Sequence, residues 1–312
     1  MRDKVLFTYN PNAGTKRLVP RLNDVVCELM DENSDLVLVP TRKRGDAKEA
    51  VKTCVGEGGC VKVVCSGGDG TLHEVVGGMM EFEPEKRVPI AYLPAGSTND
   101  FGYSMGLPTD LVEAAKVARD GVEYPCDIGN FNGTHVVYAA AFGLFADVSY
   151  ATPQPLKNVL GHAAYVLSGA VALTNIKAVG ATVTLPGETV AGKFIMGTMV
   201  NASSIGGFRG ITGREVRLGD GKYELFLIRE PAPFQVPGLL NDIRRENFNN
   251  PLIVYRQTEE AVFDFGEEVP WTIDGEFGGA FRQARMSVLK QAVTFMAPRE
   301  GRGRDDRNDG NG

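Results

Sequence analysis

The sequence predicts an α/β N-terminal domain built on a parallel sheet, followed by a β-rich second domain of sandwich or barrel-like form. Over residues 1–124, short apolar runs alternate with helix-like segments, and over 125–298 strand-like runs follow one another with few helical interruptions. Alternating strands and helices of this length form right-handed crossovers and a parallel sheet covered on both faces. A length of 312 residues also fits two domains.

The first domain is expected to contain four strands and four helices, because β-branched or apolar runs of four to eight residues alternate with longer amphipathic stretches. The strands are expected at 4–9, 36–39, 61–65 and 88–93, and the helices at 17–32, 46–57, 71–80 and 111–119.

The second domain is expected to consist mainly of strands separated by turns. The expected strands are 136–142, 178–185, 193–201, 223–229, 252–257, 261–265, 269–274, 284–289 and 292–296, with helices only at 156–174 and 234–246. The tail 299–312 carries no apolar side chain, so it is predicted to be disordered.

Charge and composition exclude some functions. There are 33 basic against 39 acidic residues, a net charge of −6, which argues against a general nucleic-acid binder and against attachment to anionic lipid by charge alone. The five cysteines form no CxxC pair, and the longest apolar stretch, 163–173, is too short to span a bilayer. No signal peptide is recognisable, so a cytoplasmic protein is expected.

Three polar or glycine-rich segments follow three of the predicted parallel strands. They are NPNAG at 10–14, SGGDG at 66–70 and PAGSTND at 94–100. Ligands of such sheets bind beyond the carboxyl ends of the strands, so the three segments are expected to meet at one edge.

The second of these segments suits a phosphate group. Its glycines let main-chain N–H groups approach an anion, and a helix begins directly after it. Asp69 in the same loop would repel a bare phosphate but fits a divalent cation held between carboxylate and phosphate. An ordinary turn with an aspartate cap is the alternative. The segment is not a dinucleotide fingerprint, because His73 stands where a glycine is needed.

Two further features contribute candidate residues. Asp100 offers a second carboxylate at the same edge, although it is also a good N-cap for a helix entering at Phe101. Near the C-terminus, Asp274 and Glu276 end a strand in a turn, and alternation would place them on one side if the strand continued. Either acid is a candidate base for a substrate hydroxyl.

Five motifs in order resemble the bacterial soluble diacylglycerol kinase family: NPNAG at 10–14, SGGDGTLHEVVGGM at 66–79, LPAGSTNDFG at 93–102, CDIG at 126–129 and IDGEFGG at 273–279. Related families are lipid kinases acting on phosphatidylglycerol and the sphingosine kinases. The GGDG loop is also shared with NAD kinases and phosphofructokinases, whose fold the first domain is expected to resemble.

The resemblance implies an ATP-dependent lipid kinase, with diacylglycerol converted to phosphatidic acid as the first expectation. It implies ATP and Mg²⁺ as cofactors, a membrane lipid as substrate through peripheral contact at the inner face of the membrane, no nucleic acid, and a homodimer. Another lipid acceptor, a soluble-metabolite kinase of NAD-kinase type and a regulator without catalysis remain as alternatives.

The resemblance also assigns roles to individual residues. Glu276 would accept the proton with Asp274 in support, and Asp69, Asp100 and Asp127 would organise the catalytic Mg²⁺. ATP would be held by Asn10, Pro11, Asn12, Ala13, Gly14, Thr41, Gly67, Gly68, Asp69, Gly70, Thr71, Glu74, Ser97 and Asn99. A second, structural Mg²⁺ would be bound by Asp220 with main-chain oxygens of Arg217 and Lys222. Independently of the resemblance, apolar residues recur at helical spacing in 156–174; most such stripes belong to a core, and the alternative hypothesis is that this helix borders the acyl-chain entrance.

Overall fold

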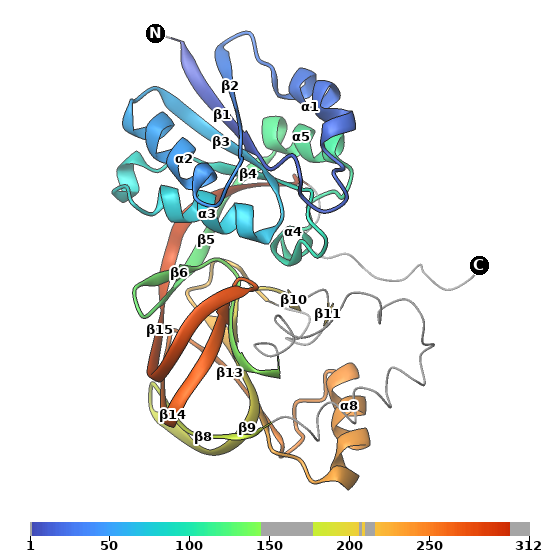
Figure 1. The fold of residues 1–312 in the computed structure, drawn as a ribbon, viewed down its shortest axis with the longest axis vertical. Coiled ribbons are helices and arrows are strands. Elements are labelled where there is room, and N and C mark those ends of the chain that lie inside the picture. The colour runs from blue at the N-terminus through green and yellow to red at the C-terminus, as the bar shows by residue number, and fades with distance from the viewer. Residues whose placement is uncertain (1, 145–176, 206–207, 210–215, 300–312) are drawn as a thin grey trace, which may run out of the picture. The chain divides into compact units, whose positions relative to one another are not determined.

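The computed structural model describes residues 2–144, 177–205, 208–209 and 216–299 (Figure 1). The chain divides into two compact units. Unit 1 comprises Met1–Tyr124 with Thr294–Gly312, and unit 2 comprises Pro125–Val293. The helix expected at 156–174, with its apolar stripe, lies outside the described residues, and so does nearly all of the expected tail.

Unit 1 is built on a parallel sheet, as the sequence predicts. Its strands are β1 (Asp3–Tyr9), β2 (Ser34–Pro40), β3 (Cys60–Gly67) and β4 (Ile90–Pro94), in the order β4-β3-β1-β2. All neighbouring pairs are parallel. The end of β15 (Glu276–Ala297) adds a further parallel neighbour to β4. The carboxyl ends of the four strands therefore share one edge.

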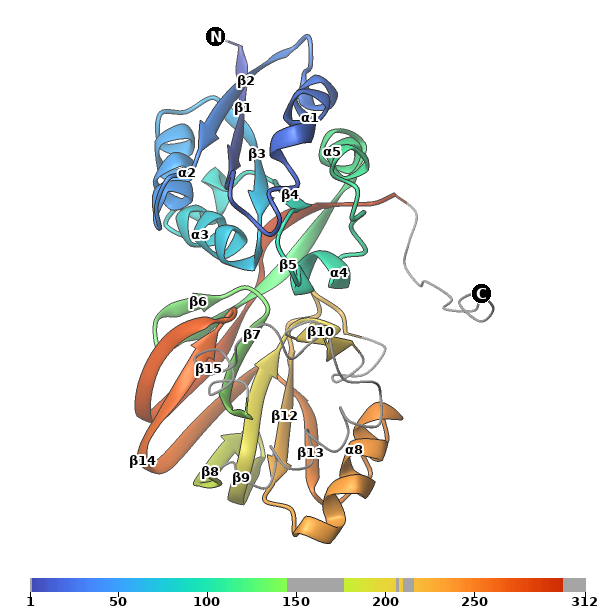
Figure 2. The same ribbon diagram turned by 45° about the vertical axis from the view of Figure 1, so that its right-hand side comes forward.

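Helices cover both faces of this sheet (Figure 2). On one side lie α1 (Leu22–Leu29) and α5 (Leu111–Asp120), which pack with Phe7 and Val64 into one apolar core. On the other side lie α2 (Asp46–Gly56) and α3 (Asp69–Met79), which contact each other. Short helices complete the unit at Val19–Arg21 (η1), Pro84–Lys86 (η2) and Asp100–Ser104 (α4).

The first predicted helix, 17–32, is wrong in length. The chain forms only a single 3-10 turn, η1, before α1 begins at Leu22. Pro20 in that turn has no N–H to donate, so a regular α-helix cannot run through it from upstream.

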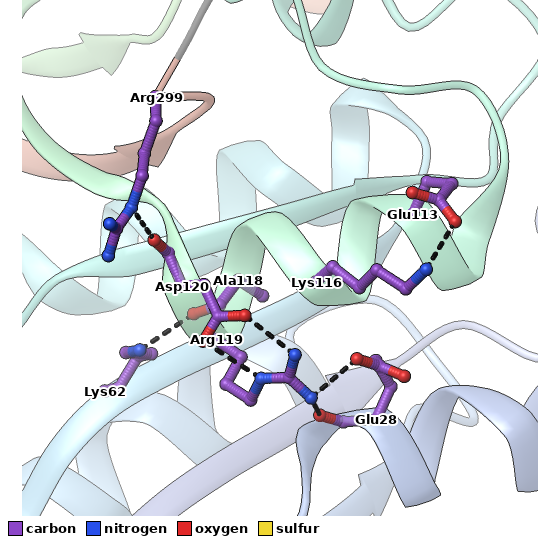
Figure 3. Close-up of polar contacts among 8 residues, drawn as sticks. All are labelled: Glu28, Lys62, Glu113, Lys116, Ala118, Arg119, Asp120 and Arg299. Carbon is purple, nitrogen blue, oxygen red and sulfur yellow. Dashed lines mark hydrogen bonds and ion pairs between the residues drawn. The ribbon is translucent and has the colours of Figure 1, made fainter.

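A polar cluster ties the carboxyl end of α5 to its surroundings (Figure 3). The guanidinium of Arg119 binds both carboxylate oxygens of Asp120, at 3.0 and 2.7 Å, and also contacts Glu28 of α1. Lys62 of β3 donates to the carbonyl oxygen of Ala118 at 2.7 Å. These contacts hold the carboxyl end of α5 near the start of β3, and therefore away from the carboxyl edge of the sheet.

Unit 2 is an antiparallel, strand-rich unit. The order is β13-β12-β9-β7-β14-β15, and β8 pairs with both β14 and β9, so β9, β7, β14 and β8 close into a small barrel-like sheet. A helix, α8 (Val236–Arg244), follows the 3-10 turn η4 (Pro233–Gln235). The strands are β5 (Val122–Phe131), β6 (Thr134–Val136), β7 (Ala139–Gly143), β8 (Val179–Leu185), β9 (Glu188–Val200), β12 (Tyr223–Arg229), β13 (Ile253–Thr258), β14 (Glu260–Ile273) and β15, with a separate pair β10 (Ser204–Ile205) and β11 (Phe208–Arg209).

Several strand boundaries in unit 2 differ from the prediction. The runs 261–265 and 269–274 form one long strand, β14, because a register shift in its pairing accommodates the charged residues between them. The two runs at 284–289 and 292–296 likewise belong to β15. The run 136–142 is instead interrupted between β6 and β7. β5 is a strand that the prediction missed, because Pro125 and several polar residues weaken its pattern.

The two faces of the unit 2 sheet carry different side chains. One face packs around Trp271, whose ring centroid lies 4.7 Å from that of Phe131 and 5.0 Å from that of Phe142. On β12, Leu225 and Leu227 point into this core. Phe226 belongs to a second core with residues of α8. Successive residues of β12 therefore alternate between the core around Trp271 and the core with α8.

Candidate active site

Three loops meet at the carboxyl edge of the unit 1 sheet, as the sequence predicts. The loop after β1 is joined to β3, because Asn10 N donates to Ser66 O at 2.9 Å. The loop after β4 is joined to the end of β3, because Ala95 N and Gly96 N both donate to Gly67 O, at 2.8 and 3.0 Å. The loops therefore form one connected main-chain surface at this edge.

Glycines let these loops contact each other directly. Gly14 has a φ of +53°, and a Cβ atom there would lie 2.6 Å from Ala95 O. A Cβ atom on Gly96 would lie 2.5 Å from the Cα atom of Gly68. The sequence suggests that these glycines let a ligand approach the backbone. The structure shows that they also let the neighbouring loop approach it.

Asn99 holds the last of these loops in shape. Its backbone is left-handed, with a φ of +52°, a conformation that asparagine tolerates better than most residues. Its Oδ1 accepts from Gly96 N at 2.8 Å, and its Nδ2 donates to Gly96 O at 3.0 Å. Tyr92 supports the same turn, since its hydroxyl lies 3.1 Å from Gly67 O and 3.2 Å from Asn99 Oδ1. The sequence analysis did not single out Tyr92; a lone polar ring in an apolar strand was the available signal.

Asp69 is the first residue of α3, and its carboxylate is unequally satisfied. Oδ2 accepts a hydrogen bond from the Thr98 hydroxyl at 3.1 Å, while the buried Oδ1 has no hydrogen-bond partner. Burial, together with the nearby charge of Asp100, raises the pKa of Asp69 to about 6, although Thr98 and the amides of Asp100 and Phe101 favour the charged form. An unsatisfied buried carboxylate oxygen is costly, and a ligand that binds it removes that cost.

Asp69 and Asp100 are a pair of carboxylates suited to a divalent cation. Asp100, at the start of α4, is 1% exposed, and its charge acts on Asp69. No group of three or more His, Cys, Asp or Glu side chains in the described ranges lies close enough to hold a metal by itself. Mg²⁺ commonly uses only one or two carboxylates together with phosphate oxygens and water. The orphaned oxygen of Asp69 beside Asp100 therefore fits a cation that arrives with a phosphate ligand.

The remaining residues predicted for nucleotide binding lie around the same edge. Thr41 N donates to Tyr9 O at 2.8 Å and so follows directly on β2. Glu74 of α3 accepts from the amides of Gly45, at 2.8 Å, and Ala47, at 3.2 Å. The structure thus gives Glu74 a definite positioning role, because it fixes the start of α2. Pro11, Asn12, Ala13, Gly70, Thr71 and Ser97 lie in or next to the three loops.

In unit 2, Asp274 and Glu276 belong to a tight hairpin turn. Strand β14 ends at Ile273 and does not continue, so the alternation expected for the two acids does not apply. Asp274 and Gly275 have φ values of +49° and +83°, which is typical of a two-residue turn that leads directly into β15. Glu276 is exposed at the start of β15, whereas Asp274 is 3% exposed.

The carboxylate of Asp274 is fully used inside the protein. Its Oδ2 accepts from Val137 N at 2.9 Å, and its Oδ1 accepts from the amides of Tyr138 and Ala139, at 2.9 and 3.1 Å. Asp274 N in turn donates to Ala139 O at 2.8 Å. Asp274 therefore anchors the hairpin that presents Glu276, and it does so without a spare oxygen for a ligand.

Asp127 is used in the same way. Its Oδ2 accepts from Gly221 N at 2.6 Å, and its Oδ1 accepts from Gln291 N at 2.7 Å. Burial raises the pKa of Asp127, and these two amides lower it. The structure thus places Asp127 at the turn of Asp220 in unit 2. Asp220 accepts from Lys222 N at 3.0 Å within that turn.

Unit 2 contains one further buried acid that the sequence analysis did not single out. Glu224 on β12 is 2% exposed, and burial raises its pKa to about 7. Its position in the apolar run YELFLIR, where every other residue points to the same face, was the available signal.

Known proteins resemble this chain in sequence. Residues 4–131 match the family model of the diacylglycerol kinase catalytic domain. A diacylglycerol kinase of Staphylococcus carnosus is 29% identical over 96% of this chain and 97% of its own length. A diacylglycerol kinase of Staphylococcus aureus strain MRSA252 is 28% identical over 96% of this chain and 94% of its own.

Solved structures share the fold. A crystal structure of a diacylglycerol kinase from Bacillus anthracis str. Sterne aligns with a TM-score of 0.75, at 21% identity over 96% of this chain and 98% of that one. Another structure from the same organism aligns with a TM-score of 0.80, at 24% identity over 96% of both chains.

The chain is therefore similar to diacylglycerol kinases over nearly its whole length, and it shares their fold. The predicted resemblance to the diacylglycerol kinase family is confirmed, with the catalytic-domain match confined to residues 4–131. No described helix is long and apolar enough to cross a membrane.

Proposed function

We propose that the protein transfers the terminal phosphoryl group of ATP to a lipid hydroxyl, with diacylglycerol as the acceptor and phosphatidic acid as the product. The observation that carries the proposal is the unpartnered buried oxygen of Asp69, next to Asp100, at the N-terminus of α3. That position attracts phosphate and a divalent cation together.

The loops of unit 1 supply the nucleotide-binding part of the mechanism. Main-chain N–H groups of the segment Gly67–Thr71 and the N-terminal end of α3 would bind phosphate oxygens, with the loop 10–14 beside them. Asp69 and Asp100 would hold Mg²⁺, which neutralises phosphate charge when bound. Phosphoryl transfer depends mainly on positioning and electrostatic stabilisation, so a site without a Walker lysine is sufficient.

Unit 2 would supply the base. The acceptor oxygen forms the new bond to the γ-phosphorus as the bond to the bridging oxygen breaks, and the hydroxyl proton passes to the carboxylate of Glu276. Asp274 would contribute by fixing the hairpin through its three amide contacts. The roles of Asp127 and of Asp220, Arg217 and Lys222 in Mg²⁺ binding remain predictions.

Exposed aromatic side chains support contact with a lipid surface. Phe277, directly after Glu276, is 56% exposed, and Phe234 in η4 is 83% exposed. Aromatic rings of this kind insert readily at membrane interfaces. We therefore propose transient membrane contact by unit 2; the homodimer implied by the resemblance is testable by light scattering.

The test is transfer of radiolabel from [γ-³³P]ATP with Mg²⁺ to lipids in detergent micelles, offering diacylglycerol, phosphatidylglycerol, sphingosine and, separately, NAD. Labelled phosphatidic acid is expected. Asp69→Asn should lower kcat at least about 100-fold. Glu276→Gln should lower kcat strongly while leaving ATP binding, measured by calorimetry, intact. Label on NAD, or unchanged turnover in both variants, would refute the proposal.

A further inference from the structure

Two buried polar side chains share one face of the unit 2 sheet. On β12, Leu225 points into the core around Trp271, so Glu224 points to the opposite face. The register places Glu224 opposite Val200 of β9, and Phe226 opposite Thr198. Directly paired residues share a face, so Glu224 and Thr198 are diagonal neighbours on it, with separations of about 7–8 Å between such positions.

Both side chains lack hydrogen bonds that burial demands. Thr198 is fully buried, and its Oγ1 has no partner. Glu224 is 2% exposed; its Oε1 accepts only from Gln257 Nε2, at 3.3 Å, and its Oε2 has no partner. Native proteins retain few unsatisfied buried polar groups, and each one costs stability. Two of them on one face indicate a polar ligand.

The register also connects this face to the hairpin of Glu276. Val200, opposite Glu224, pairs with Ala139 of β7. Ala139 exchanges two hydrogen bonds with Asp274, the residue that anchors the hairpin. Glu224 therefore lies in the same cross-strand row as Asp274, three strand spacings or about 15 Å away along the sheet.

The neighbouring positions on this face are mostly apolar. They are occupied by Val200, Ala139, Ala141 and Phe226, with Thr272 of β14 paired to Ala141. A ligand that fits must combine a few neutral polar atoms with apolar bulk. The glycerol esters of a diacylglycerol have this composition, with two carbonyl oxygens next to acyl chains.

We propose that Thr198 and Glu224 bind the glycerol-ester region of the acceptor lipid, with the Thr198 hydroxyl donating to one ester carbonyl and the protonated carboxyl of Glu224 donating to the other. This inference rests on the proposed function and deepens it, because it names a determinant of acceptor choice. The neutral hydroxyl of Thr198 and the apolar surroundings favour an ester over a charged amine.

The test compares a 1,2-diacylglycerol with the matching 1,2-dialkylglycerol, an ether lipid without carbonyl groups. Thr198→Val should lower kcat/KM for the diacyl lipid about 10-fold, the effect of one lost hydrogen bond, and leave the dialkyl lipid unchanged. Thr198→Ser should restore the ester preference. Glu224→Leu should weaken binding of the diacyl lipid, seen as a raised KM, while Glu224→Gln retains most of it.

Two controls separate a ligand role from a structural one. Thr198→Val and Glu224→Leu should unfold at the same or a higher temperature without lipid, because they remove unsatisfied groups. Thr272 is the matched control residue, since it is buried on β14 with its hydroxyl already 3.3 Å from Ala141 O. Thr272→Val should leave the ester-to-ether ratio unchanged.

The contrary outcomes are distinct. An equal loss on both lipids in Thr198→Val, or no ester preference in the unmodified protein, overturns this inference while the kinase function stands. Preferential use of a long-chain amino alcohol, lost in Glu224→Gln, also overturns it by showing a carboxylate–ammonium contact. Failure of the unmodified protein to phosphorylate any lipid removes the proposed function, and this inference with it.

Discussion

Asp69 in unit 1 and Asp274 in unit 2 are both acids at the ends of strands, and their surroundings differ in one respect. Asp274 accepts three main-chain hydrogen bonds, so its carboxylate is satisfied within the protein. Asp69 accepts one from Thr98 and keeps a buried oxygen without a partner. The first arrangement stabilises the fold, whereas the second leaves a buried carboxylate oxygen unsatisfied, as the proposed cation site requires.

The same distinction applies to Asp127. The resemblance grouped Asp127 with Asp69 and Asp100 around Mg²⁺, but the structure gives it two amide donors, from Gly221 and Gln291. Its contacts resemble those of Asp274 more than those of Asp69. Hydrogen-bond satisfaction thus separates acids that a motif comparison treats alike.

The largest expected effect is loss of stability at Asp274. Asp274→Ala leaves the amides of Val137, Tyr138 and Ala139 without their acceptor. At about 1–3 kcal/mol for each unsatisfied buried group, the free energy of unfolding should fall by at least about 3 kcal/mol. Urea unfolding followed by the fluorescence of Trp271, the only tryptophan, reports on the core of unit 2.

Asp274→Asn is the matched control, because asparagine tolerates the positive φ and keeps one acceptor oxygen. Its loss of stability should lie between those of the unmodified protein and of Asp274→Ala. Equal stability of all three proteins would show that the anchor of the hairpin lies elsewhere.

The sequence predicts features that depend on local patterns, and it does not predict contacts between residues that lie far apart along the chain. The parallel sheet and its three loops follow from strand alternation and from polar segments after β1, β3 and β4. The partners of Asp274 could not be predicted, because Val137–Ala139 lie more than 130 residues away in sequence and pair with it only through β7. Long-range pairing also determines the continuous β14 and the shared face of Thr198 and Glu224.

At the glycines, local patterns are incomplete for a different physical reason. In sequence, Gly14, Gly68 and Gly96 are typical of anion-binding loops, and nothing local shows that the loops contact one another. Tyr92 was missed likewise, because its hydroxyl group acquires a role only once β4 lies beside β3.

A smaller effect is expected in the pH dependence of stability at Asp69. Burial raises the pKa of Asp69 from 3.8 to about 6. The folded protein therefore binds more protons than the unfolded chain between these values, and this group lowers the free energy of unfolding as pH rises from about 4 to 6. The shift corresponds to at most about 3 kcal/mol.

Asp69→Asn removes this titration. Without divalent cations, the variant should match the unmodified protein near pH 3, where Asp69 is protonated in both states, and exceed its stability increasingly up to pH 7, as measured by urea unfolding at each pH. A variant that is less stable at pH 7 would mean that the Asp69 carboxylate is satisfied in the protein, as that of Asp274 is.

The smallest expected effect tests the contact between the loops themselves. Gly96→Ala places a Cβ atom 2.5 Å from the Cα atom of Gly68. The Cα atom belongs to the backbone and the backbone fixes the Cβ position, so neither atom can rotate away. Relieving such overpacking typically costs about 1–3 kcal/mol, and separating the loops should also raise the KM for ATP. Gly77→Ala in α3 is the control, since a Cβ atom there meets nothing within 4 Å and alanine favours the helix by about 1 kcal/mol. If the two variants bound ATP equally well and were equally stable, the edge of unit 1 would tolerate separated loops. The contrast between this edge and the hairpin of Asp274 would then depend on the unsatisfied oxygen of Asp69 alone.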